Sequence, residues 1–140
     1  MSPRRFNPET DLAPMPFDER VCRRALEMKN SGLKWRPQVG CFVWDPDEFI
    51  KPASPFPGRI YFVLSLARFI EIFDKTEQMT RKLVWLPTWH QARLVCRQLG
   101  ITDEVFEKQR QRCLSSQPVE ELLGIYELIV ETLKIGDQLP

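Results

Sequence analysis

The spacing of hydrophobic residues predicts helices at both ends of the chain and a small sheet between them. Between residues 17 and 31, apolar positions recur every three or four residues, which is the period of a helix that buries one face. The same period marks residues 89–99, 102–114 and 118–136, so the last third of the chain is expected to be helical. The stretch 118–136 is apolar almost all round, which indicates a helix central to the core or shared with a second subunit.

Three short stretches rich in β-branched and aromatic residues predict strands. They are residues 38–44, 60–64 and 83–86. After residue 64, polar side chains recur at helical spacing and predict a helix over 66–74. One long helix that begins at Arg59 is an alternative that is consistent with the same pattern. Residues 76–82 can add a further helical turn. The segment 45–58 holds four prolines in fourteen positions and is expected to be a loop.

These elements indicate the α+β class, with four or five helices covering a sheet of about three strands. The predicted domain is a single one, residues 17–140, and 140 residues are enough to bury a core without a metal or a disulfide. Residues 1–16 contain four prolines and no hydrophobic period, and are expected to form an extended arm.

Charge and composition narrow the classes of partner. The formal net charge of +1 does not favour nucleic acid, and no apolar run or leader pattern predicts membrane insertion or secretion. A cytoplasmic protein is therefore expected. The four cysteines are widely spaced within apolar stretches, which predicts buried thiols and no zinc site. Glycine-rich phosphate loops are missing from the sequence, and no cofactor is predicted.

The acidic cluster of the sequence DPDEF has two interpretations. Asp45, Asp47 and Glu48 carry the oxygen ligands that Mg²⁺ or Ca²⁺ prefers. The glycine and the terminal glutamate of a calcium-binding loop are missing, however, and an Asp-Pro pair commonly begins a turn. We therefore predict a capped turn and no metal site.

The stretch VWLPTWHQARLVCRQLG, residues 84–100, combines two tryptophans, the only histidine and one cysteine. Thr88 and Gln91 have the spacing of a reciprocal helix cap, so a helix is expected to begin after Thr88. At about 100° per residue, Trp89 and Cys96 fall on one arc of this helix and are expected to lie in the core.

The opposite face of this helix carries His90, Arg93 and Arg97. In one interpretation they form a solvated basic stripe that pairs with acidic residues of the last helix. In the other, Thr88, His90, Arg93, Arg97 and the free N–H groups of the helix end bind a phosphate or a carboxylate.

No catalytic constellation is assembled by the sequence motifs, and no catalytic residue is assigned. The leading hypothesis is a non-enzymatic domain that binds a protein partner or forms a homodimer, since the last predicted helix is too apolar for one face. Its expected interaction surface is Leu94, Ile125, Leu128 and Ile129. The alternative is a binding protein or enzyme for a small anionic ligand at Thr88, His90 and Arg93.

Overall fold

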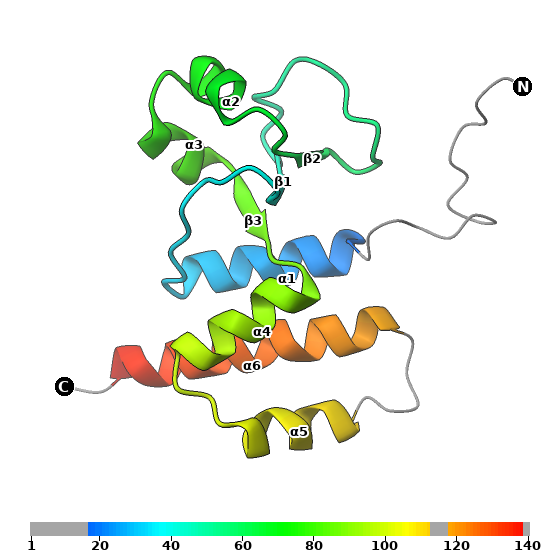
Figure 1. Ribbon diagram of the computed structural model, residues 1–140, viewed down its shortest axis with the longest axis vertical. Coiled ribbons are helices and arrows are strands. Elements are labelled where there is room, and N and C mark those ends of the chain that lie inside the picture. Colours follow the sequence, from blue (N-terminus) through cyan, green and yellow to red (C-terminus); the bar gives the residue numbers. More distant parts are fainter. Residues whose placement is uncertain (1–16, 113–117, 139–140) are drawn as a thin grey trace, which may run out of the picture.

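The structure is a computed structural model that describes residues 17–112 and 118–138, and it confirms the α+β class (Figure 1). Over these residues, three strands and six helices follow one another. In chain order they are α1 (Glu19–Asn30), β1 (Phe42–Trp44), β2 (Ile60–Phe62), α2 (Leu66–Phe73), α3 (Thr76–Lys82), β3 (Val84–Leu86), α4 (Trp89–Gln98), α5 (Asp103–Arg112) and α6 (Pro118–Gln138). The arm expected at 1–16 lies outside the described residues.

The sheet is antiparallel with strand order β2-β1-β3, and it separates two hydrophobic clusters. Val43, in the central strand, pairs with Tyr61 on one side and with Trp85 on the other. Because side chains alternate along a strand, Val43 and Tyr61 face the cluster under α2 and α3, whereas Phe42 and its neighbours on that face pack toward α1. Both faces of the central strand β1 are therefore covered by hydrophobic side chains.

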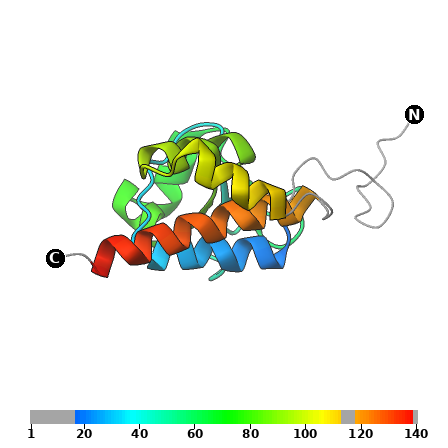
Figure 2. The ribbon, with the colours of Figure 1, turned by 90° about the horizontal axis from the view of Figure 1, so that it is seen from below.

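The second layer is built around α6, which lies between α1 and α5 (Figures 1 and 2). Its central residues Tyr126 and Ile129 are fully buried, and α4 packs across the same helix. The hydroxyl of Tyr126 donates a hydrogen bond to the carbonyl oxygen of Pro87, which ties α6 to the junction between β3 and α4. This junction positions α4 relative to the sheet.

Several predicted boundaries need correction. Residues 38–41 form a turn and not the start of a strand, because Gly40 has a φ of 98° and the amide of Cys41 bonds the carbonyl of Gln38. Residues 76–82 form a helix of their own, α3. The last helix does not end at Gly136 but continues through it to Gln138. The alternative of one long helix from Arg59 is wrong, since residues 60–62 form β2.

Asp45 organises the long loop between β1 and β2. Its carboxylate is fully buried and accepts hydrogen bonds from the amides of Phe49 (3.1 Å) and Ile50 (2.8 Å). The guanidinium of Arg59 donates to the same carboxylate at 2.7 Å, and Arg59 itself has a φ of 61°. The predicted capped turn is thus confirmed, and the loop is fixed at both ends by one side chain, because Asp45 and Arg59 are also its boundaries.

Within the described part of the chain, no helix combines the length and the apolar character needed to cross a bilayer.

Candidate functional site

The helix cap predicted at the start of α4 is present. The amide of Gln91 donates to the hydroxyl oxygen of Thr88 at 3.2 Å, and the amide of Thr88 donates to the side-chain oxygen of Gln91 at 2.9 Å. This reciprocal pair sets both the position where α4 begins and the orientation of the Gln91 side chain.

Trp89 was expected in the core, and this prediction is wrong: its side chain is 39% exposed. As the first residue of α4, it lies where the helix leaves the end of β3, and a helical side chain points back toward the N-terminus of its helix. The rest of the predicted buried arc is correct at Ala92, Val95 and Cys96.

The predicted basic stripe does lie away from the core, but its members are not gathered around a cavity. His90 and Arg97 are exposed, and the Thr88 hydroxyl is used in the cap. Arg93 donates to the carboxylate of Asp103 at 2.5 Å and lies 4.0 Å from the centre of the Phe106 ring. That hydrogen bond lowers the pKa of Asp103. Arg93 thus links α4 to α5, which differs from the expected pairing with the last helix.

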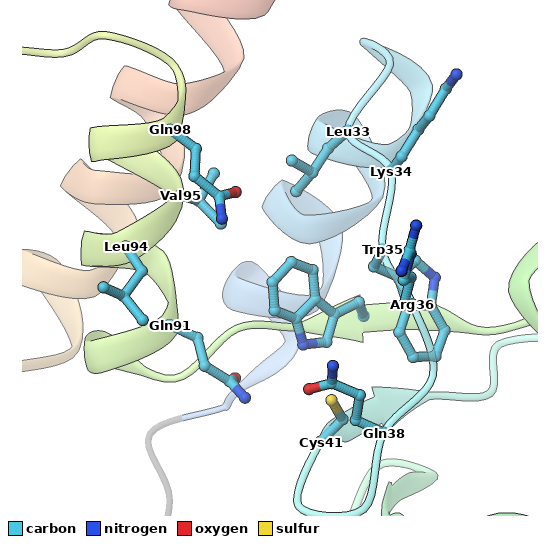
Figure 3. A pocket seen from close by; sticks show the side chains of 11 residues that line it. Leu33, Lys34, Trp35, Arg36, Gln38, Cys41, Gln91, Leu94, Val95 and Gln98 are labelled. Atoms are coloured by element: carbon cyan, nitrogen blue, oxygen red, sulfur yellow. The ribbon is translucent and has the colours of Figure 1, made fainter.

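A different arrangement lies on the other flank of α4. A cavity of about 600 Å³ separates α4 from the segment 33–41 that follows α1 (Figure 3). Gln91, Leu94, Val95 and Gln98 form the wall on α4, and Figure 3 shows Leu33 opposite them. Two parts of the chain that are far apart in the sequence meet here: the segment after α1, and the consecutive elements β3, which contributes Trp85, and α4.

Two tryptophans form the aromatic part of this cavity, which we call the indole pocket and define by Trp35, Trp85, Gln91, Gln38, Cys41 and Arg36. The rings of Trp35 and Trp85 are stacked, with centroids 6.3 Å apart and planes inclined by 15°. Both ring N–H groups are buried, and neither has an acceptor among residues 17–112 and 118–138. Leaving a buried donor unpaired costs about 1–3 kcal/mol, so each N–H is a point at which an acceptor atom would be stabilising.

The amide of Gln91 supplies a donor with a fixed direction. Its oxygen is occupied by the Thr88 amide in the helix cap, so its NH₂ group is the part left to face the pocket. Figure 3 shows Gln91 and Gln38 extending toward Cys41 from the two walls. Burial raises the pKa of the Cys41 thiol, and the neighbouring Gln38 backbone and Gln91 side chain oppose that rise.

The charged residues that line the pocket are all basic. Among the described residues that line it, Lys34 and Arg36 are basic and none is acidic. Both side chains are exposed at the rim, and Figure 3 shows Lys34 extending away from the cavity. Among the described residues that line the pocket, an anionic group at the mouth would therefore meet two exposed cations and no repelling carboxylate.

The cysteines offer no activated nucleophile in the described part of the chain. Burial raises the pKa of Cys41 and Cys96, and raises that of Cys22 to about 12. The predicted burial is confirmed for these three, and Cys113 lies outside the described residues. A reactive cysteine instead needs a lowered pKa and access to solvent.

We therefore expect iodoacetamide to alkylate these three thiols very slowly in the native protein at pH 8. A thiol with a pKa of about 12 is only about 0.01% thiolate at that pH, and burial blocks the reagent as well. Mass spectrometry of digests from native and urea-unfolded protein measures the difference at each cysteine. Fast native labelling of Cys41 would contradict its burial in the pocket wall.

The four residues of the expected interaction surface differ in their exposure to solvent. Leu94 is exposed at the rim of the indole pocket, and Leu128 is partly buried. Ile125 and Ile129 are only 3% and 0% exposed, because α1 and the other helices already cover them. These two residues are not available to a partner in the folded chain.

The residues that sequence reasoning missed are Trp35, Trp85, Lys34 and Arg36. A signal was present in LKWRPQ, where apolar and basic residues alternate. Leu33 and Trp35 are indeed turned inward and Lys34 and Arg36 outward, which is the period of an extended segment.

Comparison with protein-family models, with curated protein sequences and with solved structures gave no match. The function has to be argued from the geometry of the pocket itself.

Proposed function

We propose that this protein binds a small ligand with a planar, apolar body and a carboxylate or phosphate group in the indole pocket. The observation that carries the proposal is the stacked pair Trp35 and Trp85, whose two ring N–H groups are buried without an acceptor. A planar body matches the flat faces of the rings, since aromatic groups stack favourably on one another. Acceptor atoms on the ligand would pair with the Gln91 NH₂ group and, after a shift of the rings, with the indole N–H groups, which are covered in the absence of ligand.

The rim supports the anionic part of the proposal. Lys34 and Arg36 are the nearest charges to the mouth, and a carboxylate there would gain charge-assisted hydrogen bonds. The cavity volume of about 600 Å³ lies within the range of small-molecule sites, about 300–1,000 Å³. This site replaces the outer face of α4 as the favoured anion site, because Arg93 is already engaged with Asp103 there.

The first test is calorimetric titration and thermal shift with three probes: 2-naphthoate, 2-naphthamide and inorganic phosphate. We expect 2-naphthoate to bind most tightly, 2-naphthamide more weakly and phosphate least, since the aromatic body contributes most of the contact. A probe at 100 times its dissociation constant should stabilise the protein by about 2.7 kcal/mol. If phosphate raises the melting temperature more than either naphthalene, the aromatic site is wrong.

Two double variants locate the site. We expect Lys34→Ala/Arg36→Ala to weaken 2-naphthoate binding roughly fivefold, about 1 kcal/mol for exposed ion pairs, and to leave 2-naphthamide unchanged. His90→Ala/Arg97→Ala, on the outer face of the same helix, is the matched control and should change neither affinity. Calorimetry measures both. The reverse result would return the anion site to the start of α4, as the sequence first indicated.

A self-associating or partner-binding domain, the hypothesis drawn from the sequence, is the alternative proposal. Its main support was the apolar character of α6, but Ile125 and Ile129 are buried in the core of the chain itself. Exposed apolar side chains do occur elsewhere, along β2 and α2.

A further inference from the structure

A second cavity of about 600 Å³ runs along β2, the strand at one edge of the sheet. We call it the edge groove. It lies between the proline-rich loop 50–56 and α2, and its lining is dominated by aromatic rings. They are Phe42, Phe56, Tyr61, Phe62 and Phe69. Arg68 is the one charged residue among the described residues that line it.

The edge groove is apolar and open to solvent. Leu64 is 75% exposed, and Phe62 and Ile72 are exposed as well. Single exposed apolar side chains are common, but several around one groove usually mark a binding surface. These side chains therefore offer a surface on which an apolar segment can pack.

We propose that the edge groove binds the chain's own segment 1–16, MSPRRFNPETDLAPMP. The segment joins the described fold at Phe17, whose ring lies 5.2 Å from that of Phe42. The Phe42 ring in turn lies 5.9 Å from Phe56 and 5.0 Å from Phe62 in the groove. The point of entry of the segment is thus continuous with the aromatic wall of the groove.

The composition of the segment matches what such a groove recognises. Its four prolines favour an extended polyproline conformation, and aromatic-lined grooves bind proline-rich segments of this kind. Leu12 and Met15 supply apolar side chains close to Phe17 in the sequence. Glu9 and Asp11, which are nearer to Phe17 than Arg4 and Arg5 are, carry charges opposite to that of Arg68. At about 3.1 Å per residue, the five steps from Leu12 to Phe17 span about 16 Å. This span exceeds the path from Phe17 to Phe62 through Phe42, whose two ring-to-ring distances are 5.2 and 5.0 Å.

The covalent link makes a weak contact sufficient. A segment tethered next to its site has an effective concentration in the millimolar range, so it occupies the groove even when the free peptide binds poorly. This inference is independent of the ligand proposed for the indole pocket, because no residue lines both cavities.

The test uses nitrogen-15 NMR of the full 140-residue chain. We expect Leu12→Ser/Met15→Ser to shift the backbone amide signals of Phe62, Leu64 and Ile72. The reciprocal variant Leu64→Asp should shift those of Leu12 and Met15, and it buries no charge in the core because Leu64 is exposed. Val105→Asp, a matched change at an exposed apolar residue on α5, should shift none of these signals.

Two outcomes would overturn the proposal. If Leu12→Ser/Met15→Ser alters only signals of residues adjacent in sequence, the segment does not contact the groove. If the signals of Phe62 and Leu64 move with protein concentration in the unmodified chain, a second copy occupies the groove. Binding of 2-naphthoate should be the same in all of these variants, which keeps this test separate from that of the indole pocket.

Discussion

Replacing Asp45 with alanine is expected to lower the free energy of unfolding by about 3 kcal/mol, a large part of the 5–15 kcal/mol typical of a domain. The substitution removes the acceptor for two backbone amides, those of Phe49 and Ile50, and the partner of Arg59. Buried donors without an acceptor keep the full cost of leaving water. Urea unfolding followed by circular dichroism measures the change.

The matched control for this prediction is Asp47→Ala in the same turn. Asp47 is exposed, and exposed substitutions usually change stability by less than about 0.5 kcal/mol. Asp45→Asn should fall between the two, since one side-chain oxygen remains to accept a hydrogen bond. Equal losses for Asp45→Ala and Asp47→Ala would mean that net charge of the loop matters, and not the buried carboxylate.

The loop that Asp45 fixes is also one wall of the edge groove, so fold and surface depend on the same hydrogen bonds. The Arg59 guanidinium adds a bond to the carbonyl of Ile50 at 2.9 Å. Loosening this network should open the loop before it unfolds the helical layer, because the loop joins the hydrophobic cluster of α1, α4 and α6 only through the partly buried Phe56.

Local signals in the sequence were enough to locate the helices and strands, one helix cap and one capped turn. The Thr88 and Gln91 pair and the Asp45-Pro46 turn are each specified by residues within five positions of one another. The change from a strand to a helix within residues 60–73 was predicted correctly, because the amino-acid sequence changes there from an apolar run to polar residues at helical spacing. These features need no knowledge of distant contacts.

Helical period was less informative about orientation. It shows which residues share a face, but the neighbouring elements decide how far the buried arc extends. The prediction for Trp89 was wrong for this reason, since Trp89 is the first residue of α4 and lies before the packed part of the helix. The indole pocket could not be predicted for a related reason: Trp35 lies far from Trp85 and Gln91 in the sequence, and nothing local predicts that they meet.

Ile129→Ala is expected to lower the free energy of unfolding by about 2–5 kcal/mol, the range for truncating a buried isoleucine. The side chain is 0% exposed at the centre of α6, where α1 and α4 pack against the same helix. The nearby Glu127→Ala, at an exposed position of α6, is the matched control and should change stability by less than about 0.5 kcal/mol. Thermal and urea unfolding measure both.

The same variant separates a core helix from a subunit interface. If Ile129 served a dimer, the melting temperature of the unmodified protein would rise with protein concentration, because association stabilises the folded state by mass action. The packing of Ile129 within one chain instead predicts that the loss in Ile129→Ala stays constant over roughly a hundredfold range of concentration. A loss that disappears at high concentration would place α6 between two copies and would contradict the burial of Ile129 within a single chain.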